Sequence, residues 1–124
     1  MSAALAEVGR AEAAYARGDA RAGLAGCKRA AGMALNALLS VAPNDAWGRS
    51  YVDHVAALAR DESASVPEAV RAACAVLLGA RPPSADLLAL RSRAGDARIV
   101  EATRDVMAHA WAAREAARRT RGVE

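Results

Sequence analysis

The stretch DARAGLAGCKRAAGMALNALLSV, residues 19–41, decides the fold. Apolar residues recur in it at steps of three and four, a spacing that places their side chains on one side of an α-helix. Small residues lie between them, so neighbouring backbones can approach closely, while the helix itself depends on packing for its stability. We therefore expect one long axial helix that the rest of the chain covers. Its apolar stripe consists of Leu24, Cys27, Ala31, Leu35, Leu38 and Val41.

The composition favours a helical bundle in a single domain. Hydrophobic residues make up 54% of the 124 residues, but aromatic residues only 3%, and Phe is absent. A core of Ala, Leu and Val suits closely spaced helices better than sheets, which favour β-branched and aromatic residues. The length is enough for one core. We expect an all-α, up-and-down bundle of about five helices over residues 1–124, with residues 115–124 as a frayed tail.

Turn residues on either side of the axial helix indicate its neighbours. A first helix over residues 3–17, with Leu5, Val8, Glu12 and Tyr15 along one side, ends at a Gly-Asp turn that folds it back as an antiparallel hairpin. After Pro43, a third helix is expected from Trp47 to Arg60, with Tyr51, Val52, Val55, Leu58 and Ala59 facing inward. His54 lies on this helix, and we expect it at a solvated edge.

The second half of the chain has clear signals for helix starts. Ser65 and Glu68 form the pattern of a capping box, which predicts a fourth helix up to Gly79. Ser84 is a possible cap for a short helix, and Gly95–Asp96 offers a break before the last one, so residues 84–117 form one helix or two. The final apolar stripe consists of Ile99, Val100, Thr103, Val106, Met107, Ala110 and Trp111.

Cysteine usage indicates a cytoplasmic protein, whereas the charge does not discriminate. The formal net charge is +3, an excess too mild to identify a partner. Cys27 and Cys74 each lie on an apolar stripe without a CxxC partner, so we expect two buried, reduced thiols. The chain has no pattern of a signal peptide or a membrane span. Neither a metal site nor a cofactor site is expected, because no phosphate-loop or zinc-spacing motif occurs.

Three residues in the final helix have catalytic character: Arg104, Asp105 and His109. A guanidinium stabilises phosphoryl charge and an imidazole moves a proton, which together are what metal-independent RNA cleavage requires. Asp105 lies four residues before His109, where a carboxylate can orient an imidazole on a helix.

The segment from Arg104 to His109 resembles the Arg-polar-His motif of HEPN domains, which are small helical proteins that include RNases of toxin–antitoxin systems. The stretch AEAAYARGDARAGLAGCKRAAGMALNALL, residues 11–39, is similar to the HEPN pattern of a Gly-Asp turn followed by a long Ala-rich helix. The resemblance implies a homodimer in which motif residues of two protomers line one cleft. It also implies RNA or a nucleotide as ligand, or a nucleotidyltransferase-type protein as partner.

Regular helix geometry leaves the role of these residues open. A step of five residues separates the Arg104 and His109 side chains by about 140° around the helix, so one chain hardly brings them together. A purely structural role would pair Arg104 with Glu101 or with a neighbouring helix. At the end of the chain, Arg114, Arg118 and Arg119 have the character of a phosphate-binding track, while Glu115 near them favours an ordinary solvated helix end.

Three interpretations follow from the sequence. The first, which we favour, is a HEPN-like module that binds a protein, a nucleotide or RNA without catalysis of its own. The second is an active metal-independent RNase that uses Arg104, Asp105 and His109. The third is a tetratricopeptide-like scaffold, although an axial helix of more than twenty residues does not fit a repeat of about 34 residues.

Overall fold

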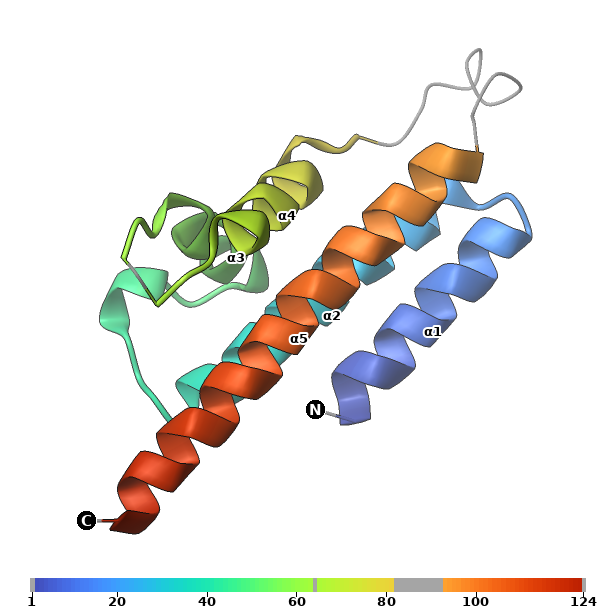
Figure 1. Cartoon of the computed structure of the whole chain (residues 1–124). Helices are drawn as coiled ribbons and strands as arrows, with labels where there is room; N and C mark the ends of the chain where they lie inside the picture. Colours follow the sequence, from blue (N-terminus) through green and yellow to red (C-terminus); the bar gives the residue numbers. More distant parts are fainter. Residues whose placement is uncertain (1, 64, 82–92, 124) are drawn as a thin grey trace.

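The computed structural model describes residues 2–63, 65–81 and 93–123 and shows an all-α bundle (Figure 1). No strand occurs in these three ranges. The expected fold class is confirmed. The helices are α1 (Ser2–Ala16), α2 (Ala20–Leu39), α3 (Tyr51–Arg60), α4 (Glu68–Gly79) and α5 (Arg93–Val123), with a 3-10 turn, η1 (Asp45–Trp47), before α3.

Helix α2 is the axis of the bundle, as the sequence predicts. It packs against α1, α3 and α5. Asp19 caps its start, where the carboxylate accepts a hydrogen bond from the Ala22 backbone N–H at 3.1 Å. Gly18 precedes the cap with a φ of 83°, a conformation that favours glycine. The predicted stripe from Leu24 to Leu38 is buried along its whole length, and the helix ends at Leu39.

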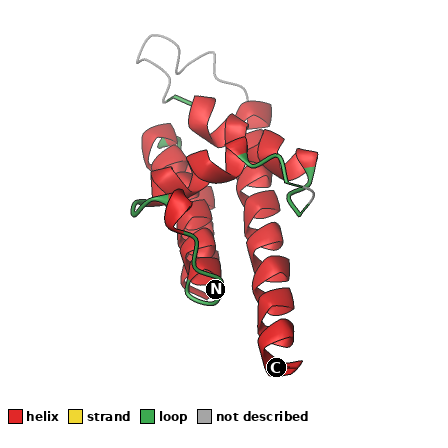
Figure 2. Cartoon of the chain, turned by 90° about the vertical axis from the view of Figure 1, so that its left-hand side faces the viewer, coloured by secondary structure: helices red, strands yellow, loops and turns green. Residues whose placement is uncertain are grey.

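The other helices cover α2 from different sides. Figure 1 shows α1 on one side of α5 and the α3–α4 pair on the other. Helix α5 contacts α1, α2 and α4, and therefore joins the two halves of the bundle. Its C-terminal part extends beyond the remaining helices, as Figure 2 shows clearly. None of the described helices is long and apolar enough to cross a membrane.

The third helix begins later than expected. Trp47 lies in η1 and is buried, and α3 starts only at Tyr51. A capping box fixes this start, because the Ser50 hydroxyl accepts from the Asp53 backbone N–H at 3.1 Å and the Asp53 carboxylate accepts from the Ser50 N–H at 3.3 Å. The expected inward position of Val52 is wrong, because this side chain is 57% exposed. Tyr51 is 38% exposed, although its α- and β-carbons lie close to Gly32 of α2.

The predicted cap of the fourth helix is wrong. Helix α4 starts at Glu68 after Pro67 and has no side-chain cap, while the Ser65 hydroxyl hydrogen-bonds with the Ser63 hydroxyl at 2.9 Å. The inward residues of α4 are as expected: Val70, Ala73, Cys74 and Leu77.

Whether Gly95–Asp96 interrupts the last helix was open from the sequence, and α5 runs through these two residues without a break. The helix continues to Val123, where the sequence predicts fraying from residue 115. The short helix proposed at Ser84 lies outside the described residues.

The core contains the two cysteines and Ala, Leu and Val side chains from all five helices. Cys27 and Cys74 are free thiols with no exposed surface, as predicted. Burial raises the pKa of both thiols, and that of Cys74 reaches about 12, so neither is a reactive thiolate. On α1, Val8 is buried as expected, but Leu5 is 55% exposed.

Candidate functional site

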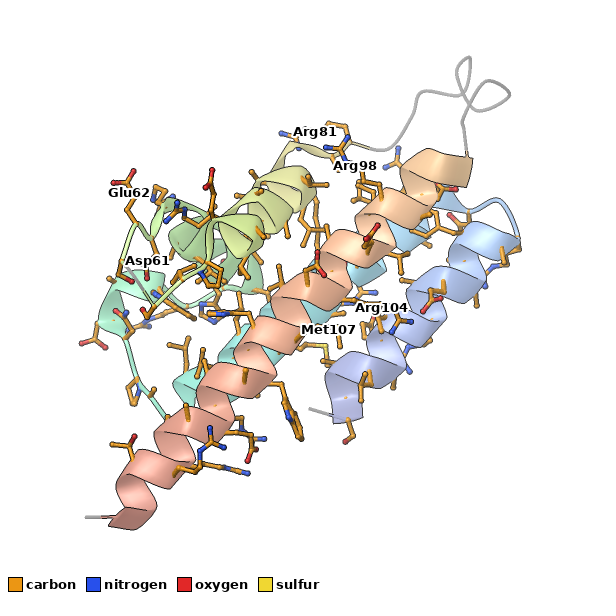
Figure 3. All side chains as sticks on the ribbon, in the orientation of Figure 1. Asp61, Glu62, Arg81, Arg98, Arg104 and Met107 are labelled. Carbon is orange, nitrogen blue, oxygen red and sulfur yellow. The ribbon has the colours of Figure 1, made fainter. Side chains whose placement is uncertain are left out.

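Arg104 lies on the side of α5 that faces α1, where it forms an ion pair with Glu12 (Figure 3). Half of the Arg104 side chain and 44% of the Glu12 side chain remain exposed. Of the two pairings considered from the sequence, the structure therefore selects a neighbouring helix over Glu101. The pair borders a cavity of about 740 Å³ between α1 and the start of α5, which Asp96 and Glu101 also line.

His109 lies on the other side of α5, half-buried against the connection between α3 and α4. Burial lowers the pKa of its imidazole, and the negative charge of Asp61 partly opposes this effect. Asp61 is held in place by the Ser63 backbone N–H, which donates to its carboxylate at 2.9 Å, and by Arg71, which donates to its carbonyl oxygen at 3.2 Å. The carboxylate near His109 is thus Asp61 and not the predicted Asp105, which is exposed.

The structure does not bring the three predicted catalytic residues together. Figure 3 shows Asp61 and Arg104 on opposite sides of α5. His109 interacts with Asp61, which lies between α3 and α4, whereas Arg104 pairs with Glu12 of α1. The two motif residues therefore interact with different parts of the bundle. Within the described residues, no three His, Cys, Asp or Glu side chains cluster as metal ligands either. Arg104 and His109 of one chain therefore face different surroundings and do not converge on a common site.

The arginines at the end of α5 differ in their exposure and in their partners. Arg118 lies 3.7 Å from Glu115 and is partly neutralised by it. Arg114 is half-buried, while Arg119 is exposed. Of the two sequence interpretations, these contacts favour an ordinary helix end.

His54 is almost completely buried, which contradicts the expected solvated edge. Its Nδ1 lies 3.0 Å from the Trp47 carbonyl oxygen, and its Nε2 has no hydrogen-bond partner. The sequence does contain a signal for this burial, because His54 is four residues before Leu58 and seven after Trp47, both of which are buried. The imidazole joins η1 to α3 and has a structural role.

The surface feature that the sequence analysis missed is an apolar groove between α1 and α5. We call it the α1–α5 groove; it is lined by Leu5, Met107, Ala108 and Trp111, with Arg104 at its edge, and has a volume of about 310 Å³. Trp111 is 48% exposed, although the sequence places it on the inward stripe of the last helix. Two large apolar side chains, Leu5 and Trp111, are therefore exposed side by side. Such clustering marks an interaction surface more often than a single exposed apolar residue does.

Comparisons with known proteins identify no family for this chain. No protein-family model matches it, and neither the curated proteins nor the solved structures include a significant match.

Proposed function

We propose that this protein is a HEPN-like helical interaction module that associates with a second copy of itself through the α1–α5 groove. The observation that carries the proposal is the exposed pair of Leu5 and Trp111 in that groove. Aromatic side chains in apolar pockets are the residues that most often dominate the energetics of protein interfaces.

The projecting end of α5 supports a second copy as the occupant. Helix α5 has 31 residues and α2 has 20, so α5 extends beyond the helices on which it packs (Figure 2). A projecting helical segment gains little stability on its own in water, whereas packing on a partner stabilises it. In a two-fold symmetric pair the projection of one protomer lies beside the groove of the other, and both grooves are covered at once.

The charges around the groove favour a protein surface over RNA. Arg104 at the edge of the groove is paired with Glu12, and Arg118 further along the helix is paired with Glu115. A phosphate would have to displace a carboxylate from each arginine. This competition reduces the favourable free energy that nucleic-acid binding gains when phosphates are neutralised and their counterions are released. A nucleotidyltransferase-type partner, which the HEPN resemblance implies, would bind to the dimer as a further protein component.

Light scattering on the purified protein tests the proposal. At 10 to 100 µM we expect the wild-type protein to be a dimer and both Trp111→Glu and Leu5→Glu to be monomers, since a carboxylate in the groove cannot be buried without a partner. Ala72→Glu introduces the same charge at an exposed alanine of α4 and should leave the dimer intact. A wild-type protein that remains monomeric throughout this range would refute the proposal.

The RNase alternative has a separate test. Mixed RNA is incubated with the wild-type protein, Arg104→Ala and His109→Ala, with EDTA present to suppress contaminating metal-dependent nucleases. We expect no cleavage above the buffer control, because the two side chains lie on opposite sides of α5. Cleavage by the wild type that both substitutions abolish would establish the RNase and contradict our assignment.

A further inference from the structure

A third cavity lies where α2, α3 and the end of α4 meet. It has a volume of about 460 Å³ and shares no lining residue with the two cavities beside α1 and α5. We call it the Lys28–Arg81 pocket, after the two basic residues that line it together with Val52, Val55, Leu77 and Leu78.

Two cationic groups converge in this pocket on one backbone oxygen. The Lys28 ammonium donates to the Ala80 carbonyl oxygen at 3.3 Å, and an N–H of Arg81 donates to the same oxygen at 2.9 Å. Arg81 also donates to the Leu78 carbonyl oxygen at 2.7 Å. Because both cations share an acceptor, they are close neighbours. Burial lowers the pKa of Lys28, and the positive charge of Arg81 lowers it further.

The charge of this pair is not neutralised by the residues that the structure describes. Among the described residues no carboxylate lines the pocket, and neither Lys28 nor Arg81 forms an ion pair with any of them. The end of α4 accounts for part of the arrangement, since a cation there offsets the negative end of the helix. Both cations hydrogen-bond to carbonyl oxygens at this helix end, and an ammonium or a guanidinium has more N–H donors than these three hydrogen bonds use, so Lys28 and Arg81 can also donate to a ligand in the pocket that they line.

The remaining walls of the pocket are apolar. Leu77 and Val55 are buried at its base, Leu78 is half-buried, and Val52 is 57% exposed at its rim. The pocket thus places an exposed apolar side chain, Val52, beside the two cations. A charged end beside apolar walls is the arrangement of small-molecule sites in which a few polar groups fix the orientation of a mainly apolar ligand.

We propose that the Lys28–Arg81 pocket binds a small amphipathic anion, with a carboxylate or phosphate head between Lys28 and Arg81 and an apolar tail on Val52 and Leu78. The head accepts hydrogen bonds from both cations and relieves their mutual repulsion, and the tail covers the exposed valine. This site is independent of the proposed dimerisation, because none of its lining residues belongs to the α1–α5 groove.

NMR titration of the 15N-labelled protein tests this site. The probes are decanoate and decyl phosphate, each below its micelle concentration, with 1-decanol as the uncharged control. We expect amide shifts to cluster at Lys28, Val52, Leu78 and Ala80 with at least one charged probe, and decanol to bind much more weakly. The charged probe that binds more tightly identifies the head group. Failure of both charged probes to bind, or equal binding of decanol, would overturn the proposal.

Matched variants show whether the two cations hold the head group. Lys28→Met keeps the apolar stem and removes the charge, and Arg81→Gln removes the guanidinium. Each should weaken binding about tenfold, the loss expected for one charge-assisted hydrogen bond. Arg49→Gln removes an exposed charge elsewhere and should leave binding unchanged. The proposed site would also be overturned if the probes shifted the amides of Leu5 and Trp111 instead, or if Lys28→Met and Arg81→Gln both left the affinity unchanged.

Discussion

Gly32 is a residue at which α2 and α3 approach each other closely. A β-carbon built on Gly32 would lie 2.1 Å from the Tyr51 β-carbon and 2.8 Å from the Tyr51 α-carbon. The second of these atoms is backbone, so a side-chain rotation cannot relieve the overlap. Helix α3 therefore depends on a residue without a side chain at this position.

Two glycine substitutions should thus have opposite effects. Gly32→Ala should lower the free energy of unfolding by about 1–3 kcal/mol, because α3 must move away from α2. Gly9→Ala should raise it by about 0.5–1 kcal/mol, because Gly9 lies inside α1 with no atom within 4 Å of an added β-carbon and Ala favours the helix. Urea unfolding monitored by circular dichroism measures both. Equal changes in the two variants would contradict the packing at Gly32.

The environment of His109 predicts a pH dependence of stability. Burial lowers the pKa of His109 in the folded protein below its ordinary value of 6.5. At pH values between the folded and the unfolded pKa, the unfolded chain binds more protons than the folded protein. The free energy of unfolding therefore rises with pH in this range, and the rise is complete above about pH 6.5. Unfolding measured between pH 5 and pH 7.5 should show this rise in the wild type and a flatter profile in His109→Gln. A wild-type profile that falls with pH in this window would contradict the assignment.

Residue type and spacing in the sequence predicted the burial of some side chains correctly and that of others wrongly. The burial of Cys27 and Cys74 follows directly from their positions on apolar stripes. The burial of His54 was missed because the residue type suggests an exposed side chain, although its spacing from Leu58 matches an inward position. The exposure of Trp111 was missed for the opposite reason, since a large aromatic residue beside an apolar stripe suggests burial.

At the scale of elements, Glu7 connects α1 to α2. Its carboxylate accepts from Arg29 of α2 at 2.8 Å and from Arg10 of its own helix at 2.5 Å, and only 9% of its side chain is exposed. The hydrogen bonds from Arg10 and Arg29 lower the pKa of Glu7 below 4.5. The carboxylate therefore stabilises the hairpin above the unfolded pKa, and this contribution is lost as the pH falls through the folded pKa.

Replacing Glu7 should destabilise the hairpin of α1 and α2. We expect Glu7→Gln to lower the free energy of unfolding at pH 7 by about 1–2 kcal/mol, a modest amount because both arginines are largely solvent-exposed. The exposed Glu62 provides the control, and Glu62→Gln should change stability by less than about 0.5 kcal/mol. Chemical unfolding at pH 7 and again near pH 3 measures the effect. If the loss at pH 3 were as large as at pH 7, the ion pairs would not be its cause.

Helix existence was easier to predict than helix boundaries. All five helices were expected where strong apolar periodicity occurs. The sequence left open whether Gly95–Asp96 breaks the last helix. It does not, because glycine costs a helix only about 1 kcal/mol and packing of α5 along α2 offsets that cost. The start of α3 was misplaced because Trp47 extends the apolar pattern into η1, and the Ser50–Asp53 capping box was overlooked.

At the scale of the whole molecule, the two halves of the bundle use different sides of α5. The α1 side includes Arg104, the α1–α5 groove and the exposed Trp111, while the α3–α4 side includes His109 and Asp61. Helical geometry predicted this separation from the sequence, because five residues correspond to about 140° of rotation. The groove itself was not predictable, since it depends on how far α1 lies from α5. These features favour assembly over catalysis within one chain.

Iodide quenching of Trp111 fluorescence across a dilution series tests the central claim most directly, because it reports both association and the face involved. Trp47 is only 8% exposed and serves as the internal reference. We predict that the quenchable fraction of the emission is small at 100 µM and rises as dilution separates the protomers and exposes Trp111. A quenchable fraction that is already large at 100 µM and does not change on dilution would contradict the assembly of two copies through the α1–α5 groove.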